Sequence, residues 1–314
     1  MKELLLLLAS IVLIASSGLA QESSQVHFAR VYRPNEAPPP AGQNITYFGG
    51  PLMLGAKNTI YIVYYGNWKT SQKNIINGWA AHLNGTGLYN VNTTYHDGSN
   101  NFVNGKVNFN SAKNTYTDLY SLGKSLNDAN VQTIVANAIS GGHLPNDTNG
   151  IYFLLTFSDV TESAFGGSFC TLFCGYHSPS NTIVSGETIK YSFVGDPNRC
   201  PSGCDGNVAV FGDTTTPNNS IDADGSINIM FHELSETVTD PEVNLGAGTT
   251  AWNSGSCGEN GDCCNFTFGT TSIATNGSHF NQTFSNGKNY LIQEMFELTG
   301  TGFTRVPGKC VQTK

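Results

Sequence analysis

The residues best suited to chemistry lie in one short stretch, His232-Glu233-Leu-Ser-Glu236, followed by Asp240. His232 and Glu236 are four residues apart, so a helix would place their side chains on adjacent turns, where both could bind one metal ion. Glu233 could act as the base that activates water on that ion, as the inner Glu does in H-E-x-x-H zinc helices. The stretch therefore predicts a metal site with His232, Glu236 and Asp240 as ligands and Glu233 as the catalytic base.

The expected ion follows from the types of ligand. A Glu stands where zinc helices of the H-E-x-x-H type carry their second His, and carboxylates suit Ca2+ as well as Zn2+. Because of the likeness to these zinc helices, zinc is the expected cofactor, and calcium is left open. Other acidic side chains downstream are alternatives to Asp240 as further ligands: Glu242, or Glu259 with Asp262. His177 and His279 are expected to be surface or hydrogen-bonding histidines.

A helix must bring these side chains together, and the apolar residues of the stretch predict one. They recur at steps of three and four and form one stripe: Ile227, Met230, Leu234 and Val238. Asp224 or Ser226 is expected to cap its start, and Pro241 ends it because the residue before a proline avoids helical geometry. The acidic residues fall on the opposite face, which is either a ligand face or an ordinary solvated face. Because only 12% of the chain is charged, we favour the ligand face.

The rest of the chain predicts an α/β fold around this helix. Apolar and aromatic runs indicate buried strands at 59–65, 150–157 and 189–194, and helical spacing indicates helices at about 70–83 and 126–139. Alternating strands and helices favour a mixed, partly parallel sheet with flanking helices. From residue 240 to 314 the composition turns to Gly, Asn, Ser and Thr, which predicts an irregular, disulfide-stapled C-terminal part.

The N-terminus predicts export. A Lys, an apolar run and a small-residue site ending at Ala20 are typical of a signal peptide over 1–20. A Pro-rich extension over 21–45 then leads into a domain over 46–314. No later run is long enough for a membrane span. Eight Asn-x-Ser/Thr sequons indicate a glycoprotein: Asn44, Asn84, Asn92, Asn146, Asn218, Asn265, Asn276 and Asn281.

The eight cysteines support the same compartment. An even number in an exported chain predicts up to four disulfides, among 105 complete pairings. Cys170, Cys174, Cys200 and Cys204 are expected in local or mutually bridging disulfides, with a zinc-thiolate site as the alternative. The adjacent Cys263 and Cys264 must take different partners.

Composition and missing motifs exclude other functions. The net charge of −8, without any cluster of Lys and Arg, argues against nucleic-acid binding. The sequence has no G-x-S-x-G turn, no G-x-x-x-x-G-K-[ST] phosphate loop and no G-x-G-x-x-G after a strand. Glycosidase chemistry stays open, since its two carboxylates need not be close in sequence.

A series of short blocks between residues 47 and 310 resembles the EXORDIUM or phosphate-induced protein family of secreted plant proteins and their microbial relatives. The blocks include Gly49-Gly50-Pro51-Leu52, Tyr64-Tyr65-Gly66, Gly150-Ile151-Tyr152, Phe169-Cys170-x3-Cys174-Gly175-x-His177, Cys200-Pro201-x2-Cys204, Asp222-x-Asp224-Gly225 and Gly287-Lys288-Asn289-Tyr290-Leu291. The resemblance implies an extracellular or cell-wall protein linked to growth and cell expansion. With its H-E-x-x-E helix, the chain looks more like the microbial branch of the family, whose order of elements is similar to that of zincin peptidases.

Two functions from different classes follow. The first is a secreted, disulfide-bonded glycoprotein that acts at the cell surface or wall on a matrix component. The second is a secreted zinc-dependent metallohydrolase, with a peptide as substrate.

Overall fold

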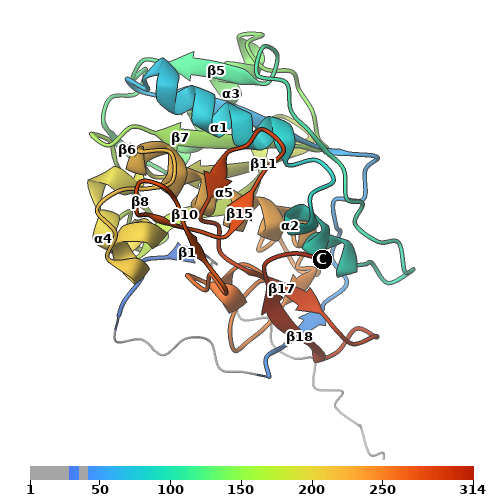
Figure 1. Cartoon of the computed structure of the whole chain (residues 1–314). Coiled ribbons are helices and arrows are strands. Elements are labelled where there is room, and N and C mark those ends of the chain that lie inside the picture. Colours follow the sequence, from blue (N-terminus) through green and yellow to red (C-terminus); the bar gives the residue numbers. More distant parts are fainter. Residues whose placement is uncertain (1–27, 35–41) are drawn as a thin grey trace, which may run out of the picture.

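A computed structural model describes residues 28–34 and 42–314 (Figure 1). The expected signal peptide therefore lies outside the described residues, as does most of the Pro-rich extension. Among the helices of the described ranges, none is both long and apolar enough to cross a membrane.

A seven-stranded mixed sheet forms the centre of the protein (Figure 1). Its strands follow the order β1 (Ala29–Arg30), β10 (Phe173–Val184), β11 (Glu187–Val194), β7 (Gly150–Thr156), β3 (Asn58–Tyr65) and β4 (Val107–Asn108), with β5 (Thr115–Asp118) also paired to β3. β11, β7 and β3 are parallel to one another, while β10 runs antiparallel to β11 and β1 antiparallel to β10. The three expected strands and the partly parallel sheet are confirmed. Sequence reasoning missed the long strand β10.

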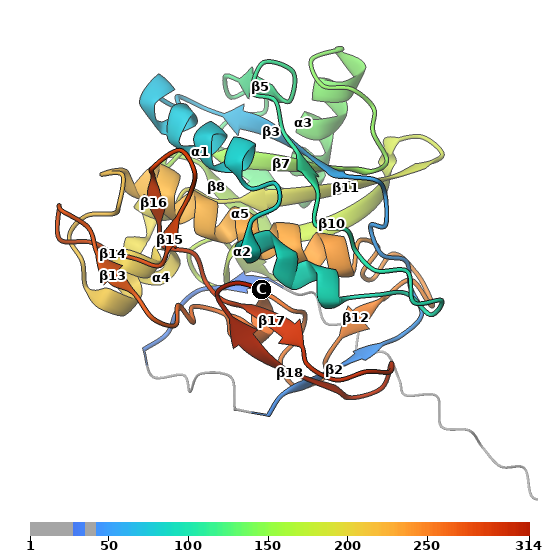
Figure 2. The ribbon, with the colours of Figure 1, turned by 45° about the vertical axis from the view of Figure 1, so that its right-hand side comes forward.

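Helices cover both faces of this sheet (Figure 2). The helices of the described ranges are α1 (Thr70–His82), α2 (Gly87–Asn90), α3 (Asp128–Ser140), α4 (Pro201–Cys204) and α5 (Ile221–Thr239). Short 3-10 helices are η1 (Val91–Thr94), η2 (Pro197–Arg199) and η4 (Asp262–Cys264), and η3 (Asn207–Phe211) is a short π-helix. On β10, the hydroxyl of Tyr176 donates to Asp128 of α3 at 3.1 Å, while the next residue, His177, contacts Glu233 of α5. Successive strand residues point to opposite faces, so α3 and α5 lie on opposite sides of the sheet. Being covered on both faces, β3 and β7 are buried throughout, which explains their continuous apolar sequences.

Helix α5 differs from expectation at its start and in its burial. Its cap is Ser220, whose side chain accepts from the amide of Ala223, and not Asp224 or Ser226. The Asp224 carboxylate instead accepts from the loop at Asn218. The helix ends before Pro241 as expected. Residues 223–239 are all buried, so the acidic face is not solvated.

The C-terminal part is built from short strands and is not irregular throughout. A four-stranded sheet joins it to the beginning of the domain in the order β12 (Trp252–Asn253), β2 (Asn44–Tyr47), β18 (Val306–Val311) and β17 (Met295–Leu298). Two smaller sheets of this part pair β13 (Ser272–Ile273) with β14 (His279–Phe280), and β15 (Gln282–Thr283) with β16 (Asn289–Tyr290). Earlier in the chain, a three-stranded sheet joins β6 (Ser125–Asn127), β8 (Thr161–Ala164) and β9 (Gly167–Ser168). The sheet that includes β2 ties the two ends of the domain together.

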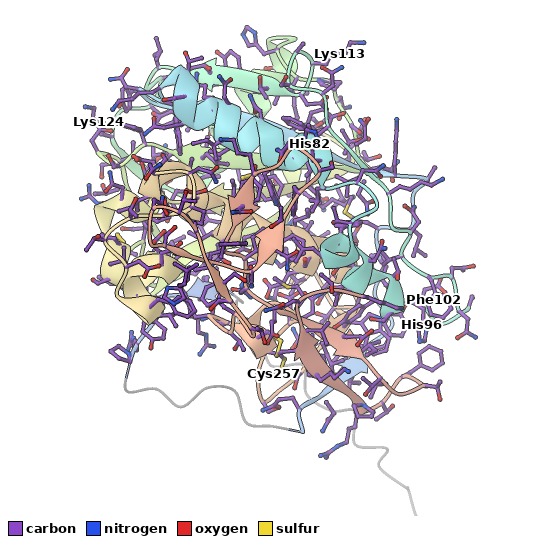
Figure 3. The ribbon with its side chains drawn as sticks, viewed as in Figure 1. His82, His96, Phe102, Lys113, Lys124 and Cys257 are labelled. Carbon is purple, nitrogen blue, oxygen red and sulfur yellow. A yellow bond between two sulfur atoms is a disulfide. The ribbon has the colours of Figure 1, made fainter. Side chains whose placement is uncertain are left out.

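All eight cysteines form disulfides, as expected. The bridges are Cys170–Cys200, Cys174–Cys204, Cys257–Cys263 and Cys264–Cys310. The first two cross-link the turn before β10 and its first residues to α4, which excludes the zinc-thiolate alternative. The last two fix the loop around Cys257, in the lower part of the molecule in Figure 3.

Candidate functional site

The centre of α5 carries the expected pair, and the two side chains meet. Nε2 of His232 lies 3.0 Å from Oε1 of Glu236, as the i, i+4 spacing predicts. Both residues are fully buried. Despite the short distance, Nε2 of His232 has no partner with hydrogen-bond geometry within the described residues. The two atoms are therefore placed like ligands directed at a shared point.

His177 of β10 joins this pair from the sheet. Its Nδ1 lies 3.3 Å from Oε2 of Glu233 and 3.5 Å from Oε2 of Glu236. Of the two expected settings, the hydrogen-bonding one is confirmed. The surface position is wrong, because β10 packs against α5 and leaves His177 only 2% exposed. The close packing depends on Gly175, where an added Cβ would lie 2.6 Å from Ile229 and 2.8 Å from the carbonyl oxygen of Phe193. His279, in contrast, is partly exposed and bonds to Asp213, as expected.

The disulfide-bonded loop between Cys257 and Cys264 closes the site from the other side. Oε1 of Glu259 lies 3.7 Å from Nε2 of His177, and Oδ1 of Asp262 lies 3.8 Å from Nε2 of His232. Between them, an added Cβ at Gly261 would lie 2.9 Å from Oε1 of Glu236. A side chain at position 261 would therefore displace the Glu236 carboxylate from the site.

A residue outside both elements orients His232. Nδ1 of His232 lies 3.2 Å from Oε1 of Gln293, and Nε2 of Gln293 donates to the carbonyl of Gly261 at 2.9 Å. The Gln293 oxygen can only accept, so Nδ1 carries the proton and Nε2 is the atom left for a ligand. Nothing in the sequence marked Gln293, whereas the Cys174-Gly175-x-His177 block could have drawn attention to His177.

Asp240 lies apart from this arrangement. Its Oδ1 accepts from the amide of Ala251 at 2.7 Å, so it holds the chain that follows α5. In the described part of the chain, two groups of three side chains bring their ligand atoms within 4.8 Å of one another, and Asp240 belongs to neither. They are His177, Glu236 and Glu259, and His232, Glu236 and Asp262. Glu242 is half-buried and is also outside both groups.

The charges of the cluster interact strongly. Burial alone would lower the pKa of His232, but the neighbouring carboxylates, Glu236 above all, raise it to about 10. Burial raises the pKa of Glu236, yet His232 and His177 outweigh it and hold the pKa below the ordinary value. Burial also raises the pKa of Glu259 well above its usual range. Buried acids and two imidazoles at this density are typical of a site for a cation.

The donor set fits a divalent metal ion. Within the described residues, several buried atoms that could bind a metal ion have no hydrogen-bond partner. They are Nε2 of His177, Nε2 of His232, Oε2 of Glu236 and both carboxylate oxygens of Glu259. Buried polar atoms are nearly always paired, so this concentration points to a missing partner that accepts lone pairs. Imidazole with carboxylate favours zinc or another transition metal over calcium, which takes oxygen ligands.

Glu233 faces a different neighbour. Its Oε1 accepts from the amide of Ala29 at 3.1 Å, and its Oε2 faces His177. Burial raises the pKa of Glu233. The expected base thus lies beside the cluster and against strand β1.

One of the eight sequons, at Asn92, lies next to the site. Asn92 is fully buried, donates to Ser235 of α5 and accepts from Asn260 of the disulfide loop. A glycan on this nitrogen would not fit the folded chain. Asn84, Asn146 and Asn276 are exposed, and glycosylation there stays a prediction.

Comparisons with known proteins agree with the expected resemblance. The chain is 29% identical to Protein EXORDIUM-like 3 of Arabidopsis thaliana over 218 residues, which cover 64% of this chain and 63% of that protein. It is 25% identical to Protein EXORDIUM of the same plant (82% of this chain, 87% of that protein) and 24% identical to Protein PHOSPHATE-INDUCED 1 of Nicotiana tabacum (82% and 87%). No solved structure matches the chain, and the zincin-like order of elements stays a prediction. Residues 45–302 match the family described as phosphate-induced protein 1 conserved region, and the chain belongs to this family.

Proposed function

We propose that this family member is an exported, metal-dependent hydrolase whose ion is held by His232, Glu236 and Asp262. The observation that carries the proposal is the buried group of these three side chains, in which Nε2 of His232 faces two carboxylates without a hydrogen bond. Asp262 replaces Asp240 as the third proposed ligand, because the disulfide-bonded loop brings its Oδ1 to 3.8 Å from Nε2 of His232.

Zinc is the ion we expect, since a buried imidazole with its other nitrogen fixed by an amide oxygen is a usual zinc ligand. Bound there, the ion would supply a Lewis acid that polarises a carbonyl group and makes water more acidic. Gln293 supports this role by holding the ring of His232.

Glu233 and His177 would move and hold the proton. Hydrolysis adds water across the bond: its hydroxyl goes to the acyl carbon, the bond to the leaving group breaks, and the proton goes to the leaving group. Oε2 of Glu233 would take that proton and then donate it. Nδ1 of His177, 3.3 Å away, would stabilise the Glu233 carboxylate between these steps.

Export is the setting we propose for this activity. Four disulfides favour an oxidising compartment, and the N-terminus has the features of a signal peptide. The names of the relatives support, as a second candidate, a role at the cell surface or wall in growth, through a matrix or cell-wall component as partner.

Metal content and hydrolysis test the proposal together. We expect about one equivalent of ion per chain in protein purified without added metal, and loss of that ion in His232→Ala. Glu233→Gln should keep the ion and lose hydrolysis of a peptide and ester panel, because it removes the base and leaves the ligands. His279→Ala is the matched control, since that histidine bonds to Asp213 away from the cluster.

Folding of each variant is checked by circular dichroism. Wild-type protein that binds no divalent ion at any tested concentration would overturn the proposal. Binding of an ion without hydrolysis, in wild type and variants alike, would leave a structural metal site and favour the non-enzymatic role.

A further inference from the structure

The N-terminal residues of the described chain lie along the edge of the main sheet as an added strand. Ala29 pairs with Gly175 and Arg30 with Phe173 of β10, in antiparallel register. The segment continues with the amide of Val31 donating to Leu172 at 3.3 Å and that of Tyr32 donating to Gly203 at 2.8 Å. These contacts are to main-chain atoms, so they do not depend on the side chains of the segment.

Residues 28–32 lie between β10 and the loop that carries Asp262. On the side away from β10, the carbonyl of Arg30 accepts from Nδ2 of Asn265 at 3.2 Å, and the ring of Tyr32 lies 5.4 Å from that of Phe266. Both partners follow Asp262 closely in sequence. The segment therefore spans the space between the strand that bears His177 and the loop that bears a proposed ligand.

One contact of the segment is made to the proposed catalytic base. The amide of Ala29 donates to Oε1 of Glu233, where a strand within a sheet would donate to a backbone carbonyl. Ala29 itself is only 3% exposed. An extended backbone thus passes directly over the carboxylate that hydrolysis would use.

Side-chain contacts hold this backbone in place. The ring of Phe28 lies 5.3 Å from that of Phe173 and 5.9 Å from that of Phe165. Val31 packs against Gly203, and a Cβ added to Gly203 would lie 2.7 Å from Cγ1 of Val31. The segment is therefore held by an aromatic contact at Phe28, before Ala29, and by a close contact at Val31, after it.

We propose that this edge of β10 is the binding site for an extended peptide substrate and that residues 28–32 occupy it as a pseudosubstrate. Strand addition to an exposed sheet edge is a common way to bind a peptide, with main-chain hydrogen bonds for affinity and side-chain contacts for selectivity. The inference rests on the proposed function for the identity of the base. It adds that the substrate is a peptide and that the chain's own N-terminal segment competes with it for the site.

A binding measurement tests this without relying on hydrolysis. The probe is a fluorescent peptide with the sequence of residues 28–34, Phe-Ala-Arg-Val-Tyr-Arg-Pro. The full chain carries Phe28→Ser and Ala29→Pro, which remove the aromatic contact and the amide that donates to Glu233. We expect this double variant to bind the probe at least about tenfold more tightly than wild type, because its own segment competes less. Phe102→Ser is the control, since Phe102 is an exposed aromatic residue near His96 at another edge of the molecule (Figure 3).

The binding assay is repeated after chelation to separate the two proposals. Probe binding with or without the ion, but no hydrolysis, keeps the peptide site and rejects the enzyme. Equal, weak binding by the double variant, wild type and Phe102→Ser overturns the peptide site, whatever the metal content. Should the double variant fail to fold, hydrogen exchange on wild type provides the test: excess probe must speed exchange at residues 28–32, and unchanged exchange refutes the proposal.

Discussion

Replacing Gly175 with Ala tests how the site is held together. Gly175 lies on β10 two residues before His177, at the point where the strand contacts α5. An added Cβ would lie 2.6 Å from Cγ2 of Ile229 and 2.8 Å from the carbonyl oxygen of Phe193. The contact with Phe193 is to the backbone of β11, so no side-chain rotation can relieve it, and β10 must shift within the sheet. The contact with α5 is to Ile229, a β-branched side chain that has one strongly preferred χ1 rotamer in a helix. The helix and the strand must therefore move apart.

The size of the effect follows from these distances. Carbon atoms pack at about 3.5–4.0 Å, so α5 must retreat from β10 by about 1 Å. Overpacking of this kind typically destabilises a core by about 1–3 kcal/mol. The same shift would lengthen the contacts of His177 with Glu233 and Glu236, which now measure 3.3 and 3.5 Å. We therefore expect lower stability together with metal binding that is weaker by about tenfold.

Urea unfolding and metal titration measure the two effects. Gly246→Ala is the matched control, since no atom lies within 4 Å of an added Cβ there and its φ is not positive. The control should unfold within about 0.5 kcal/mol of wild type, as surface substitutions usually do. Gly175→Ala protein as stable as the control, with unchanged metal affinity, would refute the reasoning that close approach of β10 to α5 builds the site.

Three further predictions concern other parts of the chain. Burial raises the pKa of Glu162 from 4.5 to about 8, so the folded protein favours its protonated form. The resulting contribution to the free energy of unfolding is complete below about pH 4.5 and is lost as the pH rises through 8. Glu162→Gln should therefore raise the urea midpoint relative to wild type at pH 9 and flatten its fall between pH 5 and 9; parallel curves would contradict this. The Cys170–Cys200 bridge already joins nearly the same two segments, so the Cys174–Cys204 bridge closes a loop of only about ten residues. Replacing Cys174 and Cys204 by Ala should therefore cost about 2–3 kcal/mol in urea unfolding, and a loss below about 1 kcal/mol would count against it. N-terminal sequencing of exported protein should begin near Gln21, and an intact Met1 would disprove the signal peptide.

Local sequence patterns were sufficient where the structure depends on neighbours in the chain. The runs 59–65, 150–157 and 189–194 became β3, β7 and β11, because continuous apolar residues require burial on both faces. The apolar stripe predicted α5, and Pro241 predicted its end. The i, i+4 contact between His232 and Glu236 follows from helix geometry alone.

Hydrogen bonds of individual side chains and contacts between distant segments were beyond such patterns. The start of α5 was misplaced because Asp224 bonds to Asn218, and the strand β10 was missed because its polar residues give little periodic signal. The C-terminal part looked irregular because its strands are short and one of their partners, β2, lies more than 200 residues earlier.

That His232, Glu233 and Glu236 share one helix could be predicted from the sequence, because the spacing of a helix is a local property. Their surroundings depend on packing between distant segments. This packing buried the whole helix, brought His177 from β10 and Asp262 from a disulfide loop, and placed Ala29 against Glu233. Those neighbours are set by sheet order and by the closing of long loops, where many pairings satisfy the same hydrophobic pattern and packing in three dimensions selects one.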